Sequence, residues 1–62
     1  MGFKLKTKQK GTEVKIYKSD VPELIGQFGV IIKNSLTTGL STIKLTSTGE
    51  IVEIPTKDLI IP

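Results

Sequence analysis

Residues 40–54 read LSTIKLTSTGEIVEI, and this stretch decides the fold. Apolar and polar side chains alternate on both sides of Thr48-Gly49, which is typical of two half-buried strands joined by a turn. An even loop centred on Thr48-Gly49 puts the apolar side chains of both strands on one face, whereas a three-residue loop would mix the faces. The even register predicts three cross-strand pairs: Leu45 with Val52, Ile43 with Ile54, and Lys44 with Glu53.

The loop of this hairpin is expected to span four residues, 47–50. A two-residue type I′ turn would force Thr48 to a positive φ, which a β-branched side chain resists. The Lys44–Glu53 pair should stabilise the hairpin by less than about 1 kcal/mol if it is exposed, so it indicates register more than it adds stability.

Two further strands are expected on the N-terminal side of the hairpin. Residues 12–18 alternate between apolar and polar side chains, and residues 27–33 form a second strand. Gly29 inside the second strand indicates a bulge or a close approach of another backbone. Residues 34–39 then predict a polar loop around one exposed leucine, Leu36.

The connection between these two strands predicts a single helical turn over residues 20–26. Asp20 can cap this turn, Glu23 stands three residues later as in a capping box, and Gly26 can end the turn in the left-handed conformation. We expect this turn to connect the strands and to carry no chemistry.

The C-terminal residues predict a tight turn and a short closing strand. Pro55 cannot donate to a central ladder, and residues 56–58 read as a turn in which the Thr56 hydroxyl bonds a backbone amide two or three residues on. Residues 59–61 follow as the last strand.

The composition favours strands throughout, because Val, Ile and Thr supply 21 of the 62 residues and Ala is absent. We therefore predict an all-β fold, a five-stranded SH3-like barrel with one short helical turn, since closure removes exposed edges. The barrel is expected to span residues 12–62. A basic N-terminal segment, residues 1–11, would precede it as an edge strand or a tail.

Charge is distributed unevenly along the chain. Residues 1–18 carry six lysines and one glutamate, whereas residues 19–62 carry three lysines and five carboxylates. In residues 3–10 the lysines stand at every second position, so an extended backbone would point four ammonium groups to one side. We expect the lysines to gather at one pole, either to protect a sheet edge or to contact an acidic partner. The candidate contact residues are Lys4, Lys6, Lys8, Lys10, Lys15, Tyr17 and Lys18.

Tyr17 has two interpretations. It lies on the outward face of the first strand, where its ring could stack on a base or anchor a protein contact. The N-terminal segment could also fold over the ring and cover it.

Catalysis and metal binding are not expected. The chain has no Cys and no His, and its close carboxylate pairs are Asp20 with Glu23 and Glu50 with Glu53. Acid–base chemistry would need one of these carboxylates in a dry pocket, which so small a core can scarcely provide. We predict a non-enzymatic protein without cofactor, metal, small-molecule substrate or membrane span, located in the cytoplasm.

Two segments carry a family resemblance that covers residues 12–62. The stretches VKI (14–16) and GQFGVI (26–31) resemble the Kyrpides–Ouzounis–Woese (KOW) type of small barrel, where a Gly-x-x-Gly step leads into the next strand. Residues 54–59, IPTKDL, are similar to the turn before the last strand of many SH3-like barrels. The spacing also resembles small SH3-like accessory subunits of photosynthetic electron-transfer complexes.

These resemblances imply different partners. KOW-like barrels often bind ribosomal RNA or transcription proteins, whereas the photosynthetic subunits hold protein neighbours and an acidic redox carrier. We expect an adaptor module that docks an acidic protein through a lysine-rich face. The alternative is weak, non-specific RNA or DNA binding, because lysine without arginine gives salt-sensitive phosphate attraction and no bidentate contacts. A purely structural or self-associating subunit is the second alternative.

Overall fold

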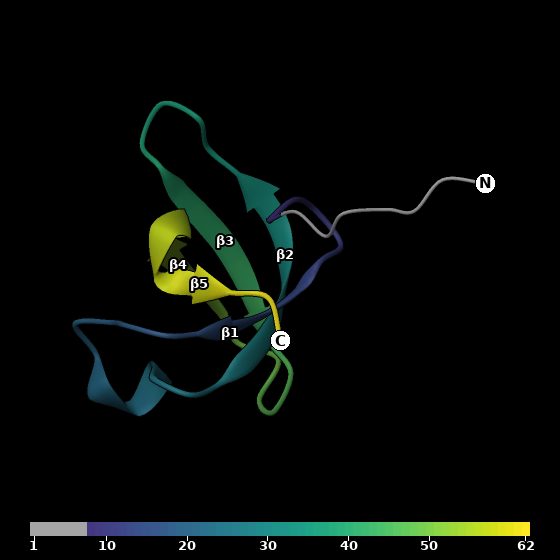
Figure 1. Ribbon diagram of the computed structural model, residues 1–62. Coiled ribbons are helices and arrows are strands. Elements are labelled where there is room, and N and C mark those ends of the chain that lie inside the picture. The colour runs from purple at the N-terminus through teal and green to yellow at the C-terminus, as the bar shows by residue number, and fades with distance from the viewer. Residues whose placement is uncertain (1–7) are drawn as a thin grey trace.

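Five antiparallel strands form a single sheet in the computed structural model, which describes residues 8–62 (Figure 1). The chain runs through β1 (Glu13–Ile16), the 3-10 turn η1 (Pro22–Leu24), β2 (Phe28–Asn34), β3 (Leu40–Leu45), β4 (Ile51–Pro55), the 3-10 turn η2 (Thr56–Asp58) and β5 (Leu59–Ile60). The predicted all-β class is confirmed, and each strand lies close to its predicted range.

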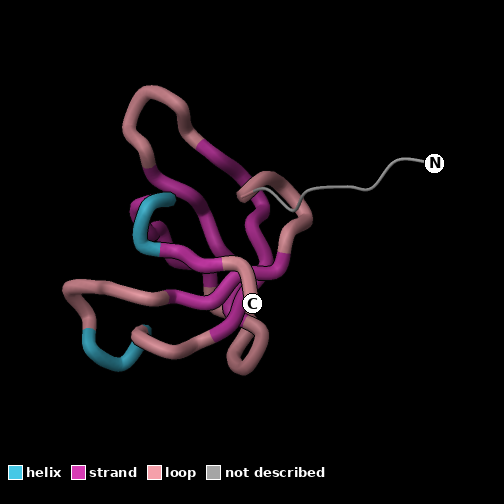
Figure 2. Tube along the Cα trace, in the orientation of Figure 1, coloured by secondary structure: helices cyan, strands magenta, loops and turns pink. Residues whose placement is uncertain are grey.

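The strand order is β4-β3-β2-β1-β5. Strands β1 to β4 pair with their neighbours in sequence, and β5 returns to pair with β1. Figure 2 shows long loops between β1 and β2 and between β2 and β3. No ladder joins β4 to β5 in residues 8–62, so the sheet is open and the predicted closure into a barrel is not confirmed. In the same residues, no helix is long and apolar enough to cross a membrane.

The core lies on one face of this sheet. Its members are apolar side chains that are at most 2% exposed: Val14, Ile16, Ile31, Ile43, Leu45, Ile54 and Leu59. Burying such a side chain stabilises the fold by about 1.5–3 kcal/mol. Because strand side chains alternate between faces, the intervening residues of the same strands point away from the core.

The β3–β4 hairpin has the expected faces in a different register. The observed pairs are Lys44 with Ile51, Ile43 with Val52, Thr42 with Glu53 and Ser41 with Ile54. The predicted pairs, Leu45 with Val52, Ile43 with Ile54 and Lys44 with Glu53, are therefore wrong by two residues. Since side chains repeat with period two along a strand, this shift keeps the same residues in the core.

The position of Gly49 explains the shifted register. The loop spans residues 46–49 instead of 47–50, and Gly49 occupies its last position with φ +79. The Gly49 amide donates to the Leu45 carbonyl at 2.9 Å, and the Leu45 amide donates to the Glu50 carbonyl at 2.8 Å. Gly49 adopts the left-handed conformation at the last position of the loop. The loop therefore begins one residue earlier than it would if Gly49 stood at its centre.

The turn between β1 and β2 also differs from its prediction. The 3-10 turn begins at Pro22, and no side chain caps it. The Val21 amide instead donates a hydrogen bond to the Ser19 hydroxyl oxygen at 3.1 Å, so the predicted cap by Asp20 is wrong. Pro22 suits the first helical position because that residue needs no amide donor. The predicted left-handed Gly26 is confirmed, with φ +89.

Gly29 allows β2 and β3 to approach each other closely. A Cβ atom at this position would lie 2.8 Å from the Lys44 carbonyl oxygen and would also overlap the Ile43 side chain. The close approach inferred for Gly29 is therefore confirmed. The irregularity of the β2–β3 ladder lies further along, between Ile31 and Lys33.

Thr56 makes a different hydrogen bond from the one expected. Residues 56–58 form the predicted turn, but no side chain caps it. The Thr56 hydroxyl lies 2.5 Å from the hydroxyl of Ser41, which is fully buried. The expected local bond to a backbone amide is wrong. The Thr56 hydroxyl instead bonds the buried Ser41 hydroxyl on β3, because buried polar groups need hydrogen-bond partners.

Candidate functional site

The outward face of the sheet carries apolar side chains that the core does not use. Phe28 is 40% exposed, Val30 36%, Ile51 56% and Ile60 41%. They come from β2, β4 and β5, which the sheet order places on both sides of β1 and β3. Single exposed apolar residues are ordinary, but a group on one sheet face indicates a contact surface.

The strand register arranges these side chains in two neighbouring rows with two lysines. In the first row Lys15 stands between Ile60 of β5 and Phe28 of β2. In the second row Val30 stands beside Lys44, and Lys44 stands beside Ile51 of β4. We call this set the outer patch; its members are Lys15, Phe28, Val30, Lys44, Ile51 and Ile60.

Lys15 and Phe28 interact within the outer patch. The Lys15 ammonium nitrogen lies 5.6 Å from the centre of the Phe28 ring. A cation over an aromatic face contributes about 0.5–1 kcal/mol at an exposed site. The contact holds a positive charge directly above an exposed ring, so a partner would meet both together.

Glu13 is the acidic side chain of these two rows, opposite Val30 at the β1 end of the second row. Lys15 follows Glu13 by two residues on the same face of β1, and Lys44 lies on β3. The centre of the outer patch is thus apolar and cationic. Such a surface is complementary to an apolar patch bordered by carboxylates.

Of the predicted contact lysines, the structure describes Lys8, Lys10, Lys15 and Lys18, which come from the segment before β1, from β1 and from the start of the β1–β2 loop. Lys4 and Lys6 lie outside the described residues. Lys10 precedes β1 and is exposed, whereas Lys18 follows β1 and is exposed at the start of the β1–β2 loop. Of the predicted lysines that the structure describes, Lys15, on β1, belongs to the outer patch.

Lys8 is bound to the body of the fold. Its ammonium group donates to the Thr56 carbonyl at 3.2 Å, and its own carbonyl accepts a hydrogen bond from the Asn34 side-chain amide at 2.9 Å. The side chain is half-buried. The Lys8 ammonium group therefore links the residues before β1 to η2.

Tyr17 keeps an open ring, with 67% of the residue exposed. Its backbone amide donates to the Asp58 carbonyl at 2.8 Å, which fixes the chain just after β1. The described residues leave the ring uncovered, and its role in binding stays a prediction.

Sequence reasoning missed five members of the outer patch. Phe28, Val30, Lys44, Ile51 and Ile60 were assigned to strands but not to one surface. The run Val30-Ile31-Ile32 has no alternation that distinguishes its faces. The patch could have been predicted only from the pairing of β1 with both β2 and β5. That pairing is a property of the strand order and cannot be read from side-chain alternation.

The described residues form no group of three or more side chains suited to a metal ion. Comparisons of the chain with protein-family models, curated proteins and solved structures found no significant match.

Proposed function

We propose that this chain is a non-enzymatic binding module that docks an acidic protein through the outer patch. The observation that carries the proposal is the pair of cross-strand rows in which exposed apolar side chains alternate with Lys15 and Lys44. Phe28 is the central anchor of this surface. It is 40% exposed, and the Lys15 ammonium group lies over its ring.

The chemistry of the outer patch defines the partner. Aromatic side chains in well-packed positions contribute most of the binding energy of protein interfaces, and charged groups around them set orientation and association rate. The partner is therefore an apolar surface bordered by Asp or Glu. A patch of six residues is smaller than the interface of a stable complex, which buries about 800 Å² per partner, so the complex is transient.

The strand order and the 3-10 turn before β5 support an SH3-like relationship for this chain. An accessory subunit that holds an acidic protein, as the resemblance to photosynthetic subunits implies, agrees with the charge of the outer patch. The KOW-like alternative predicts RNA or DNA binding. In that case the lysine ammonium groups would act without the exposed aliphatic side chains.

A titration with three labelled probes tests the proposal. The probes are an acidic plant-type ferredoxin, a single-stranded RNA and a duplex DNA, each measured at about 20 mM and about 200 mM salt, where screening is weak and strong respectively. We expect ferredoxin to bind most tightly. Its affinity should fall about tenfold or more when Lys15→Glu and Lys44→Glu reverse the charge of the outer patch.

The matched control is Lys57→Glu, which changes an exposed lysine on η2 outside the two rows. This variant should bind ferredoxin nearly as well as the unaltered chain. Tighter binding of RNA or DNA than of ferredoxin would favour the KOW-like alternative. Equal losses in all three lysine variants would contradict a role for the outer patch.

A further inference from the structure

The loop between β2 and β3 presents one leucine to solvent. Leu36 is 98% exposed. The loop around it is held by its own hydrogen bonds: the Ser35 amide donates to the Leu40 carbonyl at 2.9 Å, and the Gly39 amide donates to the Ser35 carbonyl at 3.0 Å. A side chain on an ordered loop loses little backbone entropy when it binds, so Leu36 is prepared for contact.

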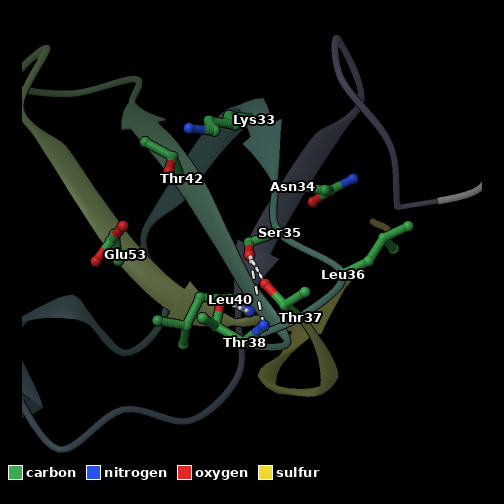
Figure 3. A pocket seen from close by; sticks show the side chains of 9 residues that line it. All are labelled: Lys33, Asn34, Ser35, Leu36, Thr37, Thr38, Leu40, Thr42 and Glu53. Atoms are coloured by element: carbon green, nitrogen blue, oxygen red, sulfur yellow. Dashed lines mark hydrogen bonds between the residues drawn. The ribbon is translucent and has the colours of Figure 1, made fainter.

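A hollow of about 550 Å³ lies beside this loop (Figure 3). Leu36 and Leu40 line it, and the sheet supplies one wall through three side chains on three adjacent strands. These are Lys33 of β2, Thr42 of β3 and Glu53 of β4. The hollow can therefore receive an aliphatic side chain between two opposite charges.

Lys33 and Glu53 flank Thr42 in a single cross-strand row, because Thr42 pairs with Lys33 on one side and with Glu53 on the other. Neighbouring strands lie about 4.8 Å apart, so the backbones of Lys33 and Glu53 are roughly 10 Å apart. An acidic or a basic partner would match one of these charges and repel the other. A surface with the same two charges in reversed order matches both.

We propose that this surface binds a second copy of the chain. A two-fold axis parallel to β3 through Thr42 places Lys33 against Glu53 of the second copy and Glu53 against its Lys33. In the proposed dimer, Leu36 of each copy contacts the other copy's hollow, which that copy's own Leu36 also lines. Self-complementarity of this kind is what a closed two-fold interface requires.

The dimer surface adjoins the outer patch on the same face of the sheet, because Thr42 lies two residues from Lys44 on β3 and Glu53 two residues from Ile51 on β4, but the two surfaces share no residue. Its row contains Lys33, Thr42 and Glu53, and none of these residues belongs to the two rows of Lys15 and Lys44. The proposal therefore stands without the acidic partner. The contact area is small, so the dimer is weak and forms at high protein concentration.

Sedimentation velocity from about 10 µM to about 1 mM tests the dimer, a range that covers weak association. The unaltered chain should pass from monomer to dimer across this range. Leu36→Ser should weaken dimerisation about tenfold or more, because it removes the inserted side chain. Ile25→Ser is the matched control, since Ile25 is also an exposed apolar loop residue, 49% exposed, and it should dimerise as the unaltered chain does.

A charge exchange tests the orientation. Lys33→Glu and Glu53→Lys should each abolish self-association, because each variant repels its own copy at two places. An equimolar mixture of the two variants should form heterodimers, since every repulsive contact becomes an attractive one. A monomeric unaltered chain at 1 mM, normal dimerisation by Leu36→Ser, or no heterodimer in the mixture would each overturn the proposal.

Discussion

The hydroxyl oxygens of Ser41 and Thr56 lie 2.5 Å apart, although fifteen positions separate them in the chain. The Ser41 hydroxyl also donates to the Asn34 side-chain oxygen at 2.5 Å. A hydroxyl has one proton to donate, so Thr56 is the donor in the bond that it shares with Ser41. These bonds join the end of β2, the start of β3 and η2 at a point where Ser41 is fully buried.

Ser41→Ala should destabilise the fold by about 1–3 kcal/mol, because Asn34 and Thr56 would lose a partner in a buried setting. Urea unfolding followed by far-UV circular dichroism measures the change. Ser47→Ala is the control: its hydroxyl donates to Gln27 at 2.8 Å on the exposed surface. Equal losses of stability in the two variants would show that the buried bonds contribute no more than an exposed one.

Gly29→Ala should destabilise the fold by about 1–3 kcal/mol, since the added methyl group overlaps Ile43 and lies against the Lys44 carbonyl. Gly49→Asn provides the comparison. Position 49 has φ +79 and open space around it, and Asn adopts positive φ more readily than other side chains. Thermal unfolding should separate the two variants clearly, and a Gly29→Ala protein as stable as the original would contradict the close approach of β2 and β3.

The hairpin register predicts which α-protons lie close together. The bonded Leu45–Glu50 pair makes Lys44–Ile51 and Thr42–Glu53 the non-hydrogen-bonded pairs, which bring α-carbons to about 4.5 Å. Strong cross-strand nuclear Overhauser effects between the α-protons of these two pairs are expected. An effect between the α-protons of Lys44 and Glu53 would instead restore the register inferred from a centred Gly49.

The same alternation explains why β4 can end in a proline. Pro55 stands opposite Leu40, at a non-hydrogen-bonded position of an edge strand. Its missing amide proton therefore removes no bond of the ladder. Substitution Pro55→Val should leave stability within about 1 kcal/mol of the original, as measured by urea unfolding, because no ladder bond is gained and only the stiffness of the chain changes. A large gain in stability would indicate that this amide position faces β3.

Phe28→Thr should separate binding from folding. The ring is 40% exposed and its contact with Lys15 is worth about 0.5–1 kcal/mol, so stability should fall only modestly. Binding of the acidic ferredoxin should fall about tenfold or more, because the variant removes the central aromatic anchor of the outer patch. Ile25→Thr, in the β1–β2 loop, is the matched control and should bind normally.

The sequence by itself determined the strands, the core faces of the first strand and of the β3–β4 hairpin, and the left-handed Gly26. Alternation of period two is a local property of the chain, and it identifies Val14, Ile16, Ile43 and Ile54 as buried whichever partner strand they meet. It also placed Lys15 on the outward face of the first strand.

Only the tertiary structure decided the hairpin register, the partner of Thr56 and the composition of the outer patch. Registers that differ by two residues bury the same side chains, so the pattern cannot choose between them, and the left-handed Gly49 makes the choice. Ile60 reaches Lys15 and Phe28 because β5 returns to β1 from the far end of the chain. Contacts of that kind depend on which strands become neighbours, and side-chain alternation carries no information about it.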